Sequence, residues 1–267
     1  MDPFVIHPPS SAKVPIIISV PHCGTAFPEE IKEEFDQGLA ERPDDTDWFV
    51  DKLYDFAPSM GIEMITAVYS RWVIDVNRDP ENKPLYTDGR IITGLCPVTS
   101  FKGEDIYVDR RKEVAEEEVA RRREAYYQPY HKVLSDSLTR IIQEHGKVLL
   151  WDCHSIRQFV PTIHPKKFPD LILGDNDGCS AGQFLTELAS KSLIASGLSF
   201  ENNYLFKGGY ITRQYGQPDQ HQHALQLEMT KVNYMDDSEI KYNPKRAEVM
   251  KDHLKRLFEK LITVLII

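Results

Sequence analysis

The 267-residue sequence has no run of about 18 apolar residues, so we expect no membrane-spanning helix. Its first residues lack a positively charged stretch and a long apolar one, so we expect no secretory signal. An excess of basic residues is also missing, because 32 Lys and Arg stand against 41 Asp and Glu and the net charge is -9. This charge argues against a nucleic-acid partner. An anionic substrate therefore needs a local basic pocket.

Cysteine is scarce. The four cysteines are far apart and form no CxxC pair, so we interpret them as free thiols of a cytoplasmic protein: Cys23, Cys96, Cys153 and Cys179. The HExxH pattern is missing as well, which excludes the common helical zinc motif. The sequence shows no repeat, no low-complexity tract and no shift in composition at a linker. We therefore expect one domain over residues 1–267.

Short apolar runs rich in β-branched residues alternate with segments of helical periodicity. The runs predict strands at 14–20, 62–70, 72–77, 147–155, 170–175 and 223–230. The periodic segments predict helices at 44–61, 110–145 (with a kink or break at Pro129), 181–197 and 243–266. Residues 79–109 lack periodicity, which is typical of a lid or binding loop. This alternation predicts an α/β fold with a mixed, largely parallel sheet flanked by helices.

Polar residues follow several of the predicted strands. His22, Asn77 with Arg78, His154 and Glu228 stand at four strand ends, where open α/β sheets bind ligands. Either histidine alone is more often structural than a ligand. The two histidines with one carboxylate make a ligand set for catalytic zinc, and the same set also suits non-haem iron.

The stretch DDTDW offers the carboxylate. Asp44, Asp45 and Asp47 are typical of a helix start favoured by the helix dipole, but one of them can face the site while another caps the helix. His154 follows Cys153 in an alternating strand, so the two side chains should point to opposite faces. This disfavours a Cys–His catalytic pair there.

Six motifs resemble the N-formylglutamate amidohydrolase family, a distant relative of the zinc carboxypeptidases. They run in family order from about residue 15 to 237: SVPHCGTAFP, DDTDWFVDKLY, SRWVIDVNRDP, DCHS, FKGGYITRQYGQP and HALQLEMT with YMDD. The resemblance implies a single three-layer, zinc-carboxypeptidase-like domain. It also implies a zinc-dependent enzyme that removes the formyl group from N-formyl-L-glutamate, a reaction of histidine degradation.

The resemblance assigns roles to individual residues. It implies one zinc ion held by His22, Asp47 and His154, with Asp47 preferred over Asp45 because it stands directly before Trp48. The choice between the two acids stays open, because His22 and the acid are not in a compact HxxE here.

The remaining assignments concern the substrate. Asn77 and Arg78 resemble an Asn-Arg pair that grips a substrate carboxylate, and Glu228 occupies the place of the catalytic glutamate. Arg71 and Arg213 either neutralise substrate carboxylates or pair with structural acids. Two alternatives remain: a related zinc amidohydrolase acting on another N-acyl amino acid, and a metal-free binding protein of the same fold.

Overall fold

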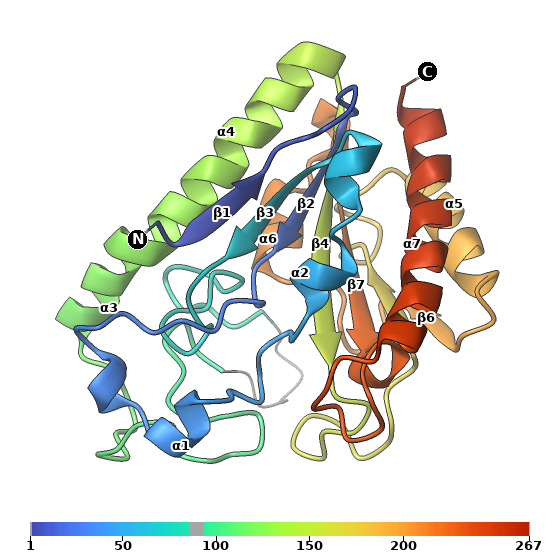
Figure 1. The fold of residues 1–267 in the computed structure, drawn as a ribbon. Coiled ribbons are helices and arrows are strands. Elements are labelled where there is room, and N and C mark those ends of the chain that lie inside the picture. The colour runs from blue at the N-terminus through green and yellow to red at the C-terminus, as the bar shows by residue number, and fades with distance from the viewer. Residues whose placement is uncertain (1, 86–92, 267) are drawn as a thin grey trace.

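A seven-stranded sheet forms the centre of the computed structural model, which describes residues 2–85 and 93–266 (Figure 1). Its strands lie in the order β1-β3-β2-β4-β7-β5-β6. Their bounds are β1 Phe4–His7, β2 Ile16–Val20, β3 Glu63–Ala67, β4 Val148–Ile156, β5 Leu171–Gly174, β6 Phe200–Asn202 and β7 Gln222–Thr230. The pairs β2–β3, β2–β4, β4–β7 and β5–β6 are parallel, whereas β1–β3 and β5–β7 are antiparallel. The predicted mixed, largely parallel sheet is confirmed.

Helices cover both faces of this sheet, which gives three layers. The helices are α1 Gln37–Ala40, α2 Val50–Leu53, α3 Glu116–Arg122, α4 Gln128–His145, α5 Gln183–Ile194, α6 Tyr210–Tyr215 and α7 Pro244–Leu265. One hydrophobic core joins the sheet to α2, α5 and α7, and a second joins the opposite face to α4 and α6. Figure 1 shows α4 and α7 on opposite sides of the strands. None of the described helices is both long and apolar enough to cross a membrane.

Strand alternation explains the two cores. In β4, Leu149, Trp151 and Cys153 point into the core under α7, whereas Val148 and Leu150 point toward α4. Cys153 is therefore a buried core residue, and His154 belongs to the opposite face. The predicted separation of these two neighbours is confirmed.

The strand predicted at 72–77 is wrong. Residues 72–77 form turns, in which the amide of Val73 donates to the Ser70 carbonyl and that of Asp75 donates to the Leu95 carbonyl. These residues are apolar because they are buried within loops, with Trp72 only 1% exposed. The neighbouring strand β3 had no free edge for them, since it pairs with β1 on one side and with β2 on the other. Asn77 and Arg78 consequently lie in a turn and not at a strand end.

The helix predicted at 44–61 is also largely wrong. Only α2 and a 3-10 helix at Ala57–Met60 form, and Phe49 has a left-handed φ of 65° that interrupts the helical path. The helix predicted at 110–145 begins at Glu116 and contains a π-helical turn at Arg123–Tyr127, directly before Pro129. Proline cannot donate a backbone hydrogen bond, which accounts for the irregular turn at the predicted position.

Four short elements were not predicted, namely β1, α1, β6 and α6. Each is at most six residues long, too short for a periodic pattern to reveal it. The loop predicted at 79–109 contains no helix or strand in its described part. Residues 86–92 of that loop lie outside the described residues.

Candidate metal and substrate site

Three neighbouring parallel strands place the first site residues at one edge of the sheet. His22 follows β2, His154 lies near the end of β4, and Glu228 lies near the end of β7. His154 is directly opposite Glu228 in the β4–β7 register. Parallel strands end at the same edge of a sheet, so residues far apart in sequence meet there.

Asp47 completes a compact cluster with the two histidines. One side-chain ligand atom from each of His22, Asp47 and His154 lies within 4.8 Å of the others, and all three residues are buried. A backbone hydrogen bond of 2.9 Å from the Asp47 amide to the His22 carbonyl fixes the acid beside β2. The sequence-predicted trio is therefore brought together by the fold.

Asp45 points away from this cluster. Its Oδ2 accepts a hydrogen bond from the indole of Trp72 at 2.9 Å, and its Oδ1 accepts one from the Phe101 amide at 2.9 Å. Of the two acids left open by the sequence, only Asp47 has a carboxylate within reach of both histidines, at 3.5 Å from His22 Nδ1 and 3.2 Å from His154 Nδ1.

Both imidazole rings have their Nδ1 atom toward Asp47 and their Nε2 atom on a second buried carboxylate. His22 Nε2 lies 2.7 Å from Asp75 Oδ1, and His154 Nε2 lies 3.0 Å from Asp152 Oδ2. These contacts fit rings that carry the proton on Nε2 and keep a lone pair on Nδ1. Carboxylates that hold metal-ligating histidines in this way orient the ring and raise its basicity.

Charge interactions in this buried cluster shift several pKa values. Burial raises the pKa of Asp47, but hydrogen bonds from His154 and His22 outweigh it and lower that pKa overall. Burial lowers the pKa of His154, but Asp152 and Asp47 outweigh it and raise that pKa well above its usual value. The cluster thus favours a positive charge between its carboxylates.

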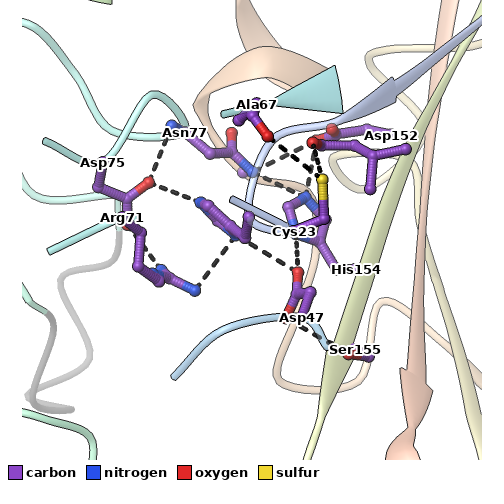
Figure 2. Close-up of polar contacts among 12 residues, drawn as sticks. Cys23, Asp47, Ala67, Arg71, Asp75, Asn77, Asp152, His154 and Ser155 are labelled. Carbon is purple, nitrogen blue, oxygen red and sulfur yellow. Dashed lines mark hydrogen bonds and ion pairs between the residues drawn. The ribbon is translucent and has the colours of Figure 1, made fainter. Parts of the chain in front are cut away.

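Asn77 holds the cluster from a second side (Figure 2). Its Oδ1 accepts a hydrogen bond of 2.7 Å from the amide of Ile211, the second residue of α6. This fixes the amide orientation, so that Nδ2 donates to Asp152 Oδ2 at 3.3 Å and lies beside His154 Nε2, 2.9 Å away. Both ends of the Asn77 amide are therefore engaged with protein groups.

The predicted arginines differ in their positions. Arg71 is buried, forms an ion pair of 2.6 Å with Asp75, and donates to His22 Nδ1 at 3.2 Å. Arg78 lies 3.6 Å from Asp75 and also donates to the carbonyl and hydroxyl of Thr93. The pKa of Asp75 is well below its usual range, because Arg71 and Arg78 outweigh the effect of burial. The cationic wall therefore contains a buried negative charge of its own.

Arg213 differs from the other two arginines. Among the described residues, Arg71 and Arg78 line one pocket that does not include Arg213. Its Nε donates to the Gly208 carbonyl at 2.9 Å, and its Nη1 donates to the Leu85 carbonyl at 3.0 Å. Both contacts hold backbone segments beside the pocket. Neither contact places the guanidinium in the pocket.

Glu228 is a buried carboxylate on the pocket wall, with 8% of its surface exposed. Burial raises its pKa to about 8, although the positive charge of His154 acts in the opposite direction. The other face of β7 carries Leu225, Leu227 and Met229 in the core under α7. Alternation along β7 thus turns Glu228 toward the pocket, as its sequence pattern predicted.

One pocket contains most of the sites predicted from the sequence. It is lined by His22, Asp47, Arg71, Asn77, Arg78, Leu85, Thr93, Phe101, His154, Ser155, Ile156, Ile163, Phe206, Gly209, Gln226 and Glu228. Its polar part lies at the strand ends, and its apolar part belongs to a small hydrophobic cluster around Ile156 and Phe206. A small polar molecule with a short hydrocarbon chain suits such a surface.

Sequence reasoning missed Asp152 as a partner of His154, and it weighed Asp75 only as a possible partner of Arg71. Asp152 stands two residues before His154 in β4, and side chains two apart share a face of a strand. That spacing could have revealed Asp152. The contact between Asp75 and His22 has no such signal, because 53 residues separate them.

The fold and the site together define an α/β protein with a two-histidine, one-aspartate cluster and a buried glutamate at the carboxyl edge of its sheet. The chain belongs to the N-formylglutamate amidohydrolase family, because the model of that family matches residues 14–235. This confirms the resemblance carried by the six motifs.

Curated relatives agree with the family assignment. The chain is 40% identical over 255 residues to an N-formylglutamate deformylase of Pseudomonas aeruginosa, covering 94% of this chain and 93% of that protein. It is 38% identical to an N-formylglutamate deformylase of Pseudomonas putida, with the same coverage. A crystal structure of N-formylglutamate amidohydrolase from Ralstonia eutropha JMP134 has a TM-score of 0.84 and 25% identity, covering 99% of both chains.

Proposed function

We propose that this protein hydrolyses N-formyl-L-glutamate to formate and L-glutamate with one bound divalent metal ion. Zinc is the ion that we expect. The observation that carries the proposal is the cluster of His22, Asp47 and His154 in one pocket with Glu228, in a chain whose curated relatives are N-formylglutamate deformylases.

The donor set fits a divalent metal. Two imidazole nitrogens and one carboxylate oxygen suit catalytic zinc with a position left for water. The negative charge of Asp47, Asp75 and Asp152 around the two rings also favours a cation there. A metal ion in this place supplies polarisation of the formyl oxygen and a lower pKa for a bound water molecule.

The protein's own groups account for the remaining steps. A cation bound by the neighbouring cluster favours the carboxylate form of Glu228. In that form Glu228 takes a proton from the attacking water and delivers it to the departing amine, so that the leaving group departs as a neutral amine. Its burial keeps bulk water from competing for that proton. Arg78 binds a substrate carboxylate, and Arg71, which lines the same pocket, helps it or binds the formyl oxygen. Asn77, with both ends of its amide engaged, holds the Asp152 carboxylate that orients His154.

Both the metal and the acyl group can be tested in one assay. Purified protein is treated with a chelator, reloaded with zinc, and supplied with a panel of N-formyl, N-acetyl and N-succinyl amino acids. We expect release of formate from N-formylglutamate, loss of that activity on chelation and its return with zinc. Preference for another acyl group supports a related amidohydrolase instead, and activity that survives complete chelation overturns the metal assignment.

A further inference from the structure

Lys231 is a buried lysine that none of the roles above requires. It directly follows β7 and begins a 3-10 helix at Lys231–Asn233. The residue is 2% exposed, and its Nζ donates to the Asp44 carbonyl at 3.0 Å. A lysine ammonium has three hydrogens to donate, and among the described residues this is its one hydrogen bond. Burying a charge with unused donors costs free energy unless a partner or a ligand compensates it.

The carboxylates beside Lys231 are engaged with other groups. Asp44 accepts hydrogen bonds from Arg157 on both of its oxygens and forms an ion pair of 3.1 Å with Lys102. Asp45 accepts one hydrogen bond on each oxygen, from an indole and from a backbone amide. Across residues 2–85 and 93–266, none of the ion pairs includes Lys231. Burial lowers the pKa of its ammonium, although Asp47 acts in the opposite direction.

Lys231 lines a small cavity that adjoins the substrate pocket. Phe101, Ser155 and Ile156 line both spaces, so they form a shared wall between them. The volume of the small cavity is about 10 Å³, which is room for one oxygen atom. Lys231 therefore lines a cavity that shares three lining residues with the main pocket.

The chemistry of the substrate provides such an oxygen. N-Formylglutamate has two carboxylates, whereas the described lining of the main pocket contains two arginines, and these share an ion pair with Asp75. Asp75 offsets one of the two positive charges. One carboxylate therefore lacks a cation of its own. A lysine ammonium is a compact point charge, suited to a single carboxylate oxygen and not to a two-oxygen contact.

We propose that Lys231 binds the side-chain carboxylate of N-formylglutamate, with one carboxylate oxygen entering the small cavity, and thereby selects an acidic amino acid. The inference rests on the proposed function and adds to it the residue that distinguishes glutamate from neutral amino acids. Arg78 then serves the α-carboxylate, and Glu228 of the same pocket serves the amide to be cleaved.

The test compares two substrates that differ in that one charge. N-Formylglutamate and N-formylglutamine are assayed with the metal-loaded parent, with Lys231→Met and with Lys102→Met. Lys102 is the matched control, since it is a lysine that is 51% exposed and forms an ion pair with Asp44, a residue that lines the same small cavity as Lys231. We expect Lys231→Met to lower kcat/KM for N-formylglutamate by about 30-fold or more and to leave that for N-formylglutamine unchanged. Lys102→Met should preserve the ratio between the two substrates.

Thermal unfolding supplies a readout that is independent of activity. The Lys231 ammonium is buried with unused hydrogen-bond donors, so replacing it by methionine removes a desolvation cost. The unfolding midpoint of Lys231→Met should therefore equal or exceed that of the parent. If Lys231→Met has a lower unfolding midpoint and loses kcat/KM equally on both substrates, Lys231 has a structural role. That outcome overturns the Lys231 assignment and leaves the proposed function standing. A parent protein with no activity on N-formylglutamate overturns the proposed function, and the Lys231 assignment fails with it.

Discussion

At the scale of single residues, the site depends on which atom of each side chain faces the cluster. His22 and His154 both turn Nδ1 toward Asp47 and rest Nε2 on a carboxylate. The atoms that we propose as metal ligands are therefore held in place by the protein's own contacts. A site built in this way loses less conformational entropy on metal binding than one made of free side chains.

The choice of acid gives the first prediction at this scale. Asp47→Asn should lose most of the bound metal, because the amide removes the negative charge shared by the two rings. Asp45→Asn should retain the metal, since Asp45 contacts Trp72 and Phe101 instead. Metal analysis after dialysis compares the two variants with the parent. Retained metal in Asp47→Asn and lost metal in Asp45→Asn would reverse the assignment.

Replacement of Glu228 gives the second prediction at this scale. Glu228→Gln keeps the shape of the side chain and removes the proton acceptor, so turnover should fall by about 10²- to 10⁴-fold. Metal content and substrate binding should stay near those of the parent, as measured by metal analysis and by calorimetric titration with the substrate. A variant that turns over at the parent rate shows that another group moves the proton.

At the scale of elements, α4 fixes the turn that carries Asn77 and Arg78. The imidazole of His131 lies 2.8 Å from the Val76 carbonyl, and the hydroxyl of Tyr127, at the end of the π-helical turn, donates to the Arg78 carbonyl at 2.8 Å. These two contacts bracket Asn77. The π-helical turn before Pro129 ends at Tyr127 and so positions the hydroxyl that holds the Arg78 carbonyl.

His131 links this packing to pH. Burial among tyrosine rings lowers its pKa to about 4, and its ring stacks on Tyr127 with centroids 4.2 Å apart. Below about pH 6.5 the His131 side chain is protonated in the unfolded chain but stays neutral in the folded protein. The stability that His131 contributes is therefore complete above that pH and falls as the pH approaches 4. The loss attributable to His131 is on the order of 1–3 kcal/mol.

Urea unfolding of the parent and of His131→Gln at a series of pH values isolates this contribution. The variant should be less stable at pH 7, because it loses contacts, and the difference should shrink as the pH falls toward 4. Aspartates and glutamates titrate in both proteins and cancel in the comparison. A difference that is constant with pH rules out titration of His131 as its origin.

At the scale of the whole molecule, an acidic chain contains a locally cationic pocket. The net charge of -9 repels anions at long range, whereas Arg71 and Arg78 line the pocket itself. Salt screens the repulsion by the net charge over about a Debye length, whereas it screens the charges of the buried arginines much less. The repulsion and the attraction therefore act at different distances. Binding of an anionic substrate therefore depends on short-range contacts at the sheet edge.

The sequence by itself determined the main strands, the α/β class and most of the site. Alternation and apolar runs located β2, β3, β4, β5 and β7, because burial on both faces leaves a pattern in the chain. Alternation also separated His154 from Cys153 and turned Glu228 toward the site. These are local consequences of a side-chain period of two.

Only the tertiary structure decided the rest. The apolar segment at 72–77 could not be told from a strand, since burial inside loops and burial in a sheet select the same residues. The position of Asp47 beside both histidines followed from a backbone contact to the His22 carbonyl, and the position of Asp45 away from them followed from its contacts with Trp72 and Phe101. The carboxylate behind His22 and the cavity beside Lys231 are long-range contacts, and nothing in the local sequence encodes contacts between residues that only folding brings together.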